Sequence, residues 1–195
     1  MKIIGITGGV GSGKSRVLSY LEEQYKAVIC QADHVAWKLQ EPGERSYCKI
    51  VEHFGKYILN EDKTINRAAL GKIVFNDESE LQVLNQITHP AVKEYIVDWI
   101  ESERNKGSAL FIIEAALLLE DNYDLICDEI WYIFAKENVR RERLKTSRNY
   151  TDEKIDSMIA NQHTEAYFRE QCQITIDNSG DFDDTCIQIE QIMRK

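Results

Sequence analysis

Residues 2–15 read KIIGITGGVGSGKS. The first six residues form an apolar run that is typical of a buried β-strand, and the residues after the glycines have helical spacing. Between them, Gly8, Gly13, Lys14 and Ser15 satisfy the pattern Gly-x-x-x-x-Gly-Lys-Ser in the required order of strand, loop and helix. The pattern predicts a phosphate-binding loop of the P-loop NTPase class.

Each residue type in this loop has a chemical reason. Glycines let the backbone turn its N–H groups inward without side chains in the way, so the loop becomes a concave nest for phosphate oxygens. Lys14 would reach the β- and γ-phosphates, and the Ser15 hydroxyl would ligate a bridging Mg²⁺. The alternative is a glycine-rich stretch that only makes a tight turn. We expect ATP as co-substrate, Mg²⁺ as cofactor, and ATP binding by Gly8, Gly9, Val10, Gly11, Ser12, Gly13, Lys14, Ser15 and Arg16.

Strand-like runs alternate with helical spacing along the chain. This alternation predicts a parallel sheet covered on both faces, with ligands beyond the carboxyl ends of its strands. The section 46–106 has helical spacing instead, and we expect it to form a helical substrate-side subdomain within a single domain of residues 1–195. The expected strands are Lys2–Thr7, Ala27–Cys30, Leu110–Ile113, Glu129–Phe134 and Gln173–Asp177.

The composition is that of a soluble globular protein, with 43% hydrophobic and 29% charged residues. A net charge of -9 would repel DNA and anionic membranes, so we expect neither as a partner. The N-terminus lacks a signal-peptide pattern, and the five cysteines form no Cys-x-x-Cys pair that would indicate a zinc site or a disulfide framework. We therefore expect a cytoplasmic protein.

A basic segment between residues 136 and 148 stands out against this acidic background. Phosphoryl transfer needs cations that neutralise charge on the moving group and exclude water, which favours an arginine-bearing lid here. The alternative is a solvated helix face with salt bridges. Its six basic residues are Lys136, Arg140, Arg141, Arg143, Lys145 and Arg148.

The loop alone does not say where the γ-phosphate goes. A GTPase would normally carry Asn-Lys-x-Asp, whereas Asn105-Lys106 continues into Gly107-Ser108, which weighs against a GTP switch. A binding-only or mechanical ATPase is an alternative from another class. The size of the chain and its basic segment favour a kinase that acts on a small metabolite.

Two carboxylates follow expected strands. A kinase needs a carboxylate near the acceptor hydroxyl, and Asp33 is suitably placed for a base, although it is equally compatible with a helix N-cap. Glu114 could hold Mg²⁺ through water, or it could be a carboxylate at the edge of the core.

Further motifs occur in a fixed order after the glycine loop. Together with Gly5–Ser15 and the Ala32-Asp33 segment, they make the whole chain resemble the dephospho-CoA kinase family. The motifs are Glu41-Pro42-Gly43, Ile65-Asn66-Arg67, Thr88-His89-Pro90, Leu117-Leu118-Leu119-Glu120, Arg143-Leu144, Gln162 and Ile176-Asp177-Asn178-Ser179-Gly180.

The resemblance implies transfer of the ATP γ-phosphate to the ribose 3′-hydroxyl of dephospho-CoA, which gives CoA and ADP. It implies a nucleoside-monophosphate-kinase-like, three-layer αβα fold of the P-loop NTPase class with a five-stranded parallel sheet. It also implies a CoA-binding helical region at about 46–106 and a lid at about 136–165. The partners would be ATP and dephospho-CoA, and the protein would be a monomer or a small homo-oligomer.

The resemblance also assigns roles to residues. Asp33, Lys14 and Arg143 would be catalytic, with Asp33 as the base, in contact with substrate, and Arg143 as the lid arginine. Arg67 and His89 would contact the substrate, although His89 is equally compatible with packing beside Pro90. Asn178 and Gly180 would lie beside the adenine of ATP, or form a plain turn.

The chain departs from the family pattern at a few positions. Gln31 stands where the first Asp of Asp-Ala-Asp is usual, and Ala116 replaces a proline. Ser147 occupies the place of a second lid arginine, with Arg148 one step later. A kinase for shikimate or a nucleoside, and an ATP-binding protein without catalysis, are the alternative interpretations.

Overall fold

The computed structural model describes residues Met1–Arg194, which fall into two compact units. The first unit comprises Met1–Ile29 and Gly107–Lys195, and the second comprises Cys30–Lys106. Among the described residues, no helix combines the length and apolar character needed to cross a membrane.

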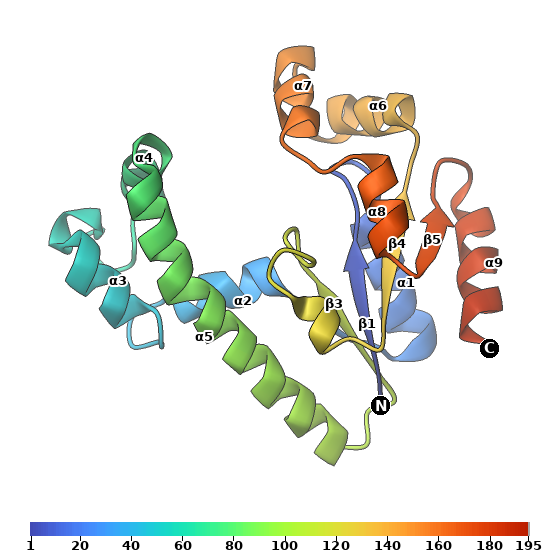
Figure 1. Cartoon of the computed structure of the whole chain (residues 1–195), viewed down its shortest axis with the longest axis horizontal. Helices are drawn as coiled ribbons and strands as arrows, with labels where there is room; N and C mark the ends of the chain where they lie inside the picture. Colours follow the sequence, from blue (N-terminus) through green and yellow to red (C-terminus); the bar gives the residue numbers. More distant parts are fainter. Residues whose placement is uncertain (195) are drawn as a thin grey trace. The chain divides into compact units, whose positions relative to one another are not determined.

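A five-stranded parallel sheet forms the centre of the fold, with the strand order β2-β3-β1-β4-β5 (Figure 1). The five strands expected from the sequence are confirmed, with ends that differ by no more than one residue. The glycine loop therefore leaves the central strand, β1, between β3 and β4. The strands are β1 (Lys2–Thr7), β2 (Val28–Gln31), β3 (Leu110–Glu114), β4 (Glu129–Phe134) and β5 (Ile174–Asp177).

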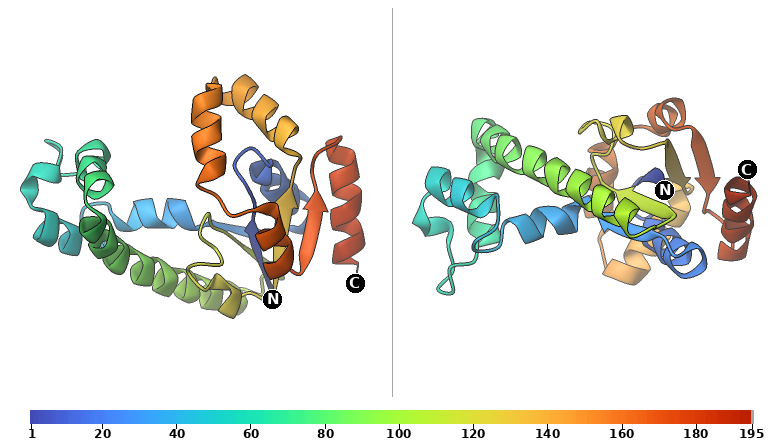
Figure 2. Two further views of the ribbon diagram at one scale, coloured as in Figure 1. Left: turned by 45° about the horizontal axis from the view of Figure 1, so that its top comes forward. Right: turned by 90° about the horizontal axis from the view of Figure 1, so that it is seen from below.

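Helices cover both faces of the sheet in the first unit, which confirms the layered α/β architecture (Figure 2). The helices of this unit are α1 (Lys14–Tyr25), α6 (Glu137–Arg148), α7 (Asp152–Ala160), α8 (Glu165–Gln171) and α9 (Phe182–Met193), with a short 3₁₀ helix η2 (Tyr123–Leu125).

Strand β4 shows how alternate side chains build the two layers. Trp131 and Ile133 are buried in one apolar cluster with residues of α1 and α9. Tyr132, which points the other way, stacks on Phe168 of α8 with 4.9 Å between the ring centroids. The two faces of β4 are thus both covered, which places the sheet in the middle and leaves its carboxyl edge for the loops.

The second unit is helical and has its own apolar core. Its core residues are Ile50, Phe54, Ile58, Ile65 and Leu70. Its elements are α2 (Ala32–Leu39), α3 (Tyr47–Phe54), the 3₁₀ helix η1 (Lys56–Ile58), α4 (Arg67–Asn76) and α5 (Glu78–Asn105).

Candidate active site

The glycine loop turns directly from β1 into α1, and its tightest position is Gly13. Gly13 has a φ of 90°, in the left-handed region that favours glycine. A Cβ at this position would also collide with the side-chain amide nitrogen of Asn178. Only glycine therefore allows the loop to close against the end of β5 while α1 begins at Lys14.

Lys14 and Glu114 meet at this loop. The Lys14 Nζ donates a 2.8 Å hydrogen bond to the Gly8 carbonyl and lies 3.7 Å from Glu114 Oε1. Their side chains are only 19% and 14% exposed. Glu114 reaches the loop because β3 pairs with β1 and places Glu114 opposite Ile6. The arrangement holds a cation at the glycine loop, beside the amino end of α1, where an anionic group would bind.

The two residues after Lys14 are exposed on the first turn of α1. The Ser15 hydroxyl is therefore accessible to a cation carried by a bound nucleotide. Arg16 has its guanidinium carbon 4.0 Å from the centroid of the Phe182 ring on α9.

Arg143 and Asn178 anchor the loop from the neighbouring elements. Arg143 Nη1 donates to the Ser12 carbonyl at 3.2 Å, and Nη2 donates to the Asn178 carbonyl at 2.8 Å. The Asn178 amide donates to the same Ser12 carbonyl at 2.7 Å and accepts from the Thr185 hydroxyl at 3.0 Å. The Asn178 side chain, 2% exposed, is thus occupied in holding the loop. That Asn178 lies beside the adenine of ATP stays a prediction, and the contact would then be made by the backbone of Asn178.

Removing this anchor is expected to destabilise the protein. Asn178→Ala would remove two buried hydrogen bonds, which should lower the free energy of unfolding by about 1–3 kcal/mol, since the Ser12 carbonyl keeps Arg143 and the Thr185 hydroxyl keeps the Asp177 carbonyl as a partner. Urea denaturation followed by circular dichroism would measure the loss. The matched control is Asn161→Ala, at an exposed position, with an expected change below about 0.5 kcal/mol. Equal stability of Asn178→Ala and the native protein would contradict the anchoring role.

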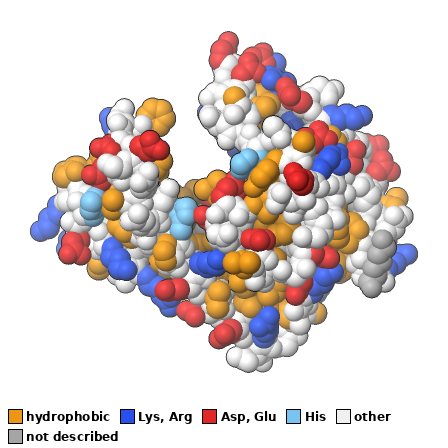
Figure 3. Space-filling model, in the orientation of Figure 1, with side chains coloured by type: hydrophobic (Ala, Val, Ile, Leu, Met, Phe, Trp, Pro, Cys, Tyr) orange, Lys and Arg blue, Asp and Glu red, His pale blue; other side chains and the backbone are white. Residues whose placement is uncertain are grey.

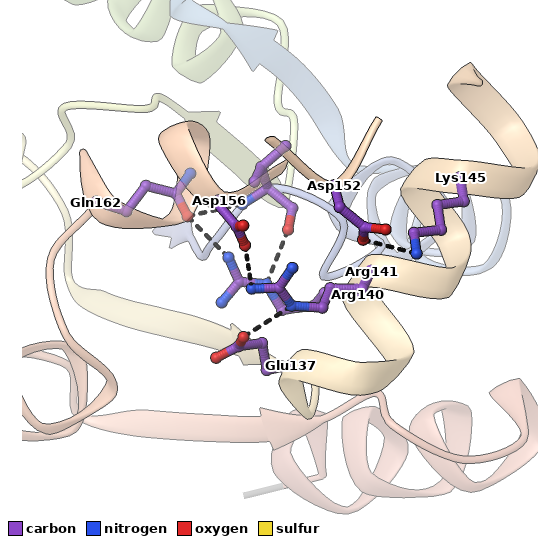
Figure 4. A network of polar contacts seen from close by, with 8 residues as sticks. Glu137, Arg140, Arg141, Lys145, Asp152, Asp156 and Gln162 are labelled. Atoms are coloured by element: carbon purple, nitrogen blue, oxygen red, sulfur yellow. Dashed lines mark hydrogen bonds and ion pairs between the residues drawn. The ribbon is translucent and has the colours of Figure 1, made fainter. Parts of the chain in front are cut away.

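A second arginine of α6 also reaches the loop. Arg140 Nε donates to the Val10 carbonyl at 2.8 Å, and Nη2 donates to Gln162 Oε1 at 2.9 Å. The same Gln162 oxygen accepts from the Val10 amide at 3.2 Å. Burial lowers the pKa of Arg140, but an arginine stays charged in proteins. Arg140 and Gln162 therefore hold both backbone polar groups of one loop residue (Figure 4).

Other cations of the basic segment pair with carboxylates instead. Arg141 contacts Glu137 at 2.8 Å and Asp156 at 2.6 Å, and Lys145 contacts Asp152 at 2.6 Å (Figure 4). Hydrogen bonds to Asp156 and Glu137 raise the pKa of Arg141. The pairs with Asp156 and Asp152 tie α6 to α7. Such intermixing of acidic and basic side chains is general over the visible face of the molecule (Figure 3).

The end of α6 shows where Ser147 and Arg148 lie, the two positions at which the chain departs from the family's second lid arginine. The Ser147 hydroxyl donates to the Arg143 carbonyl at 2.6 Å, within its own helix. The Arg148 guanidinium carbon lies 6.0 Å from the centroid of the Tyr150 ring. The α6 arginines that contact the glycine loop are thus Arg140 and Arg143.

Asp33 lies in the second unit, exposed in the first turn of α2. The N-cap of this helix is Gln31, and no side chain caps it. The alternative that Asp33 is the N-cap is therefore wrong, while its role as a base stays a prediction. Asp33 keeps an accessible carboxylate beside the positive end of a helix dipole.

Arg67 begins α4, whose N-cap Asn66 accepts from the Ala69 amide at 3.0 Å. Its guanidinium carbon lies 4.6 Å from the centroid of the Trp37 ring, within the distance for a cation–π contact. Trp37 is 46% exposed and lies one helical turn after Asp33 on α2. The structure thus brings Arg67 beside a large aromatic surface on the helix that carries Asp33.

The remaining predicted site residues are His89 and Gly180. His89 is half-buried in α5 beside Pro90, so packing and substrate contact both remain compatible with its position. Gly180 is exposed after β5, where a Cβ would meet only ordinary contact, 3.7 Å from Asp184 Oδ2.

Comparisons with known proteins identify the family of this chain. A family model described as dephospho-CoA kinase matches residues 2–184. The chain belongs to the dephospho-CoA kinase family. A dephospho-CoA kinase of Carboxydothermus hydrogenoformans is 38% identical over 196 residues, which cover 100% of this chain and 94% of that protein.

Solved structures share the fold at lower identity. The dephospho-CoA kinase from Campylobacter jejuni has a TM-score of 0.73 and 21% identity, and the match covers 99% of this chain and 98% of that one. TT1252 from Thermus thermophilus has a TM-score of 0.80 and 22% identity, with 99% and 96% coverage. This member of the dephospho-CoA kinase family therefore has the fold of P-loop kinases.

Two contacts were not predicted from the sequence. The basic segment contained Arg140, and its spacing of three from Arg143 places both on one helix face, but only the fold shows that this face meets the loop. Trp37 follows Asp33 by four positions, so the sequence places both on one side of a helix, but it does not indicate that Arg67 would contact Trp37. In this chain of the dephospho-CoA kinase family, both residues lie beside predicted site residues.

Proposed function

We propose that this chain transfers the γ-phosphate of ATP to the ribose 3′-hydroxyl of dephospho-CoA, giving CoA and ADP. The observation that carries the proposal is the Lys14 ammonium held between the Gly8 carbonyl and Glu114, at the glycine loop of a dephospho-CoA kinase family member. A cation at that position would stabilise the charge that develops on the transferred phosphoryl group.

The predicted site residues would divide the chemistry among them. The loop amides and the amino end of α1 would bind the phosphates, and Lys14 with Arg143 would neutralise their charge. Asp33 would accept the proton of the 3′-hydroxyl as its oxygen attacks the γ-phosphorus. The bond from that phosphorus to the β,γ-bridging oxygen breaks, and ADP leaves.

Mg²⁺ would enter with the nucleotide. No cluster of three or more His, Cys, Asp or Glu side chains within residues 1–194 could hold a metal alone. The exposed Ser15 hydroxyl fits a Mg²⁺ ion that keeps waters and phosphate oxygens as its other ligands, with Glu114 in reach through water. When bound, Mg²⁺ would neutralise charge on the β- and γ-phosphates. We infer that the partners are these two small molecules and that the site of action is the cytoplasm.

An ADP-release assay across acceptors tests the proposal. Purified protein with Mg·ATP should release ADP when dephospho-CoA is added, and mass spectrometry should identify the product as CoA. Shikimate and adenosine serve as alternative acceptors. ADP release with one of these but not with dephospho-CoA would overturn the assignment of the acceptor, and ATP binding without release would overturn the transferase function.

The contact between Arg67 and Trp37 gives a separate test of the acceptor site. Arg67→Met is expected to raise the KM for dephospho-CoA about tenfold, the loss of roughly one charge-assisted hydrogen bond, while the KM for ATP stays unchanged. Initial rates with each substrate varied in turn would measure both constants. A matched control is Arg45→Met, whose exposed side chain pairs with Asp98 on α5. An equal rise in both constants would contradict an acceptor-specific role.

A further inference from the structure

We propose that Arg140 and Gln162 form a latch on the glycine loop, which positions it for nucleotide binding. Neither is a catalytic residue, because the contacts that define the latch are to the loop backbone and between the two side chains. The inference rests on the proposed kinase function but concerns the nucleotide step alone.

Three hydrogen bonds define the latch. The carbonyl of Val10 accepts from Arg140 Nε at 2.8 Å, and the amide of Val10 donates to Gln162 Oε1 at 3.2 Å. Arg140 Nη2 closes the set through the same Gln162 oxygen at 2.9 Å. Both backbone polar groups of Val10 are therefore held, and rotation of either neighbouring peptide would break a bond.

The guanidinium group also lies flat against Gly9. A Cβ on Gly9 would lie 2.6 Å from the guanidinium carbon and 2.6–2.8 Å from its two terminal nitrogens. Gly9 does not have a positive φ, so its backbone conformation is open to other residues. The three heavy atoms that a methyl group at this position would approach most closely all belong to the Arg140 guanidinium. Glycine at position 9 thus makes room for the latch.

The latch joins residues near the two ends of the predicted lid at about 136–165. Arg140 lies in the first turn of α6, and Gln162 follows the end of α7 (Figure 4). Since the Val10 amide is bonded to Gln162, the phosphate contacts are left to the other loop amides. A loop held in one conformation binds without the entropic cost of ordering its backbone, so the latch should raise nucleotide affinity.

Nucleotide binding tests the latch without any acceptor. Titration calorimetry with Mg·ADP should show roughly tenfold weaker binding for Arg140→Ala and for Gln162→Ala. In the kinase assay, the KM for ATP should rise similarly while kcat stays within about twofold. The matched control is Arg141→Ala, one residue along α6, whose partners are Glu137 and Asp156 and whose binding should match the native protein.

Gly9→Ala tests the same contact without deleting it. The added methyl should displace the guanidinium and weaken Mg·ADP binding, and the effects of Gly9→Ala and Arg140→Ala should be strongly non-additive in the double variant. Additive effects, or unchanged binding with a lowered kcat in Arg140→Ala, would overturn the latch. Thermal melting of each variant separates weaker binding from unfolding. Because ADP binding needs no acceptor, failure of the latch and failure of the proposed function are distinguishable.

Discussion

Replacing Lys14 with methionine is expected to lower kcat/KM for ATP by about 100- to 1,000-fold, the loss seen when one pre-positioned group that stabilises transition-state charge is removed. Methionine keeps the length of the side chain and removes the charge. The ammonium is pre-positioned, because it is bonded to the Gly8 carbonyl and lies near Glu114, with little exposure to solvent. Initial rates at varied ATP concentration, with saturating acceptor, would measure the effect.

Lys49→Met is the matched control for charge removal. Lys49 is exposed on α3 in the second unit, so its replacement should leave kcat/KM close to the native value. The melting temperature of Lys14→Met would show whether the fold persists. A loss smaller than about tenfold in a folded Lys14→Met variant would contradict a direct role of this lysine in phosphoryl transfer.

Asp33→Asn is the second substitution with a large expected effect. The variant should lose about 100- to 10,000-fold in kcat, the range for removal of a general base, while Mg·ADP binding stays unchanged. Asparagine has nearly the same shape, and α2 does not depend on Asp33 for its cap because Gln31 is the N-cap residue. Quenched-flow measurement of ADP formation and calorimetry with Mg·ADP would supply the two quantities.

The control for this change is Asp98→Asn, an exposed carboxylate of α5 in the same unit. It should retain native turnover, because Asp98 pairs with Arg45 alone among the ion pairs described for this unit. Normal turnover of Asp33→Asn would show that another group accepts the proton of the hydroxyl.

The strands and the glycine loop could be predicted because their signals are local. Short apolar runs and the fixed spacing of Gly8, Gly13 and Lys14 depend on neighbours in sequence, which is why the strand ends agree within one residue. The same holds for the helical spacing after the glycines, where the structure has α1 over Lys14–Tyr25.

The anchoring contacts could not be predicted because their partners are remote. Asn178 meets Ser12 across 166 positions, and Arg140 meets Val10 across 130. The composition of the basic segment did not distinguish the arginines that face the loop from Arg141, which pairs with Asp156. That choice depends on the rotation of α6 about its axis, which tertiary packing decides.

The three cations at the glycine loop also have an electronic consequence. Lys14, Arg140 and Arg143 donate to the carbonyls of alternate residues, at positions 8, 10 and 12. Each carbonyl shares a peptide plane with the next amide, so the N–H groups of residues 9, 11 and 13 lie opposite a cation. A charged donor on the oxygen polarises its peptide and makes the N–H a stronger donor. The three positive side chains thus strengthen, through the peptide groups, N–H donors that they do not contact.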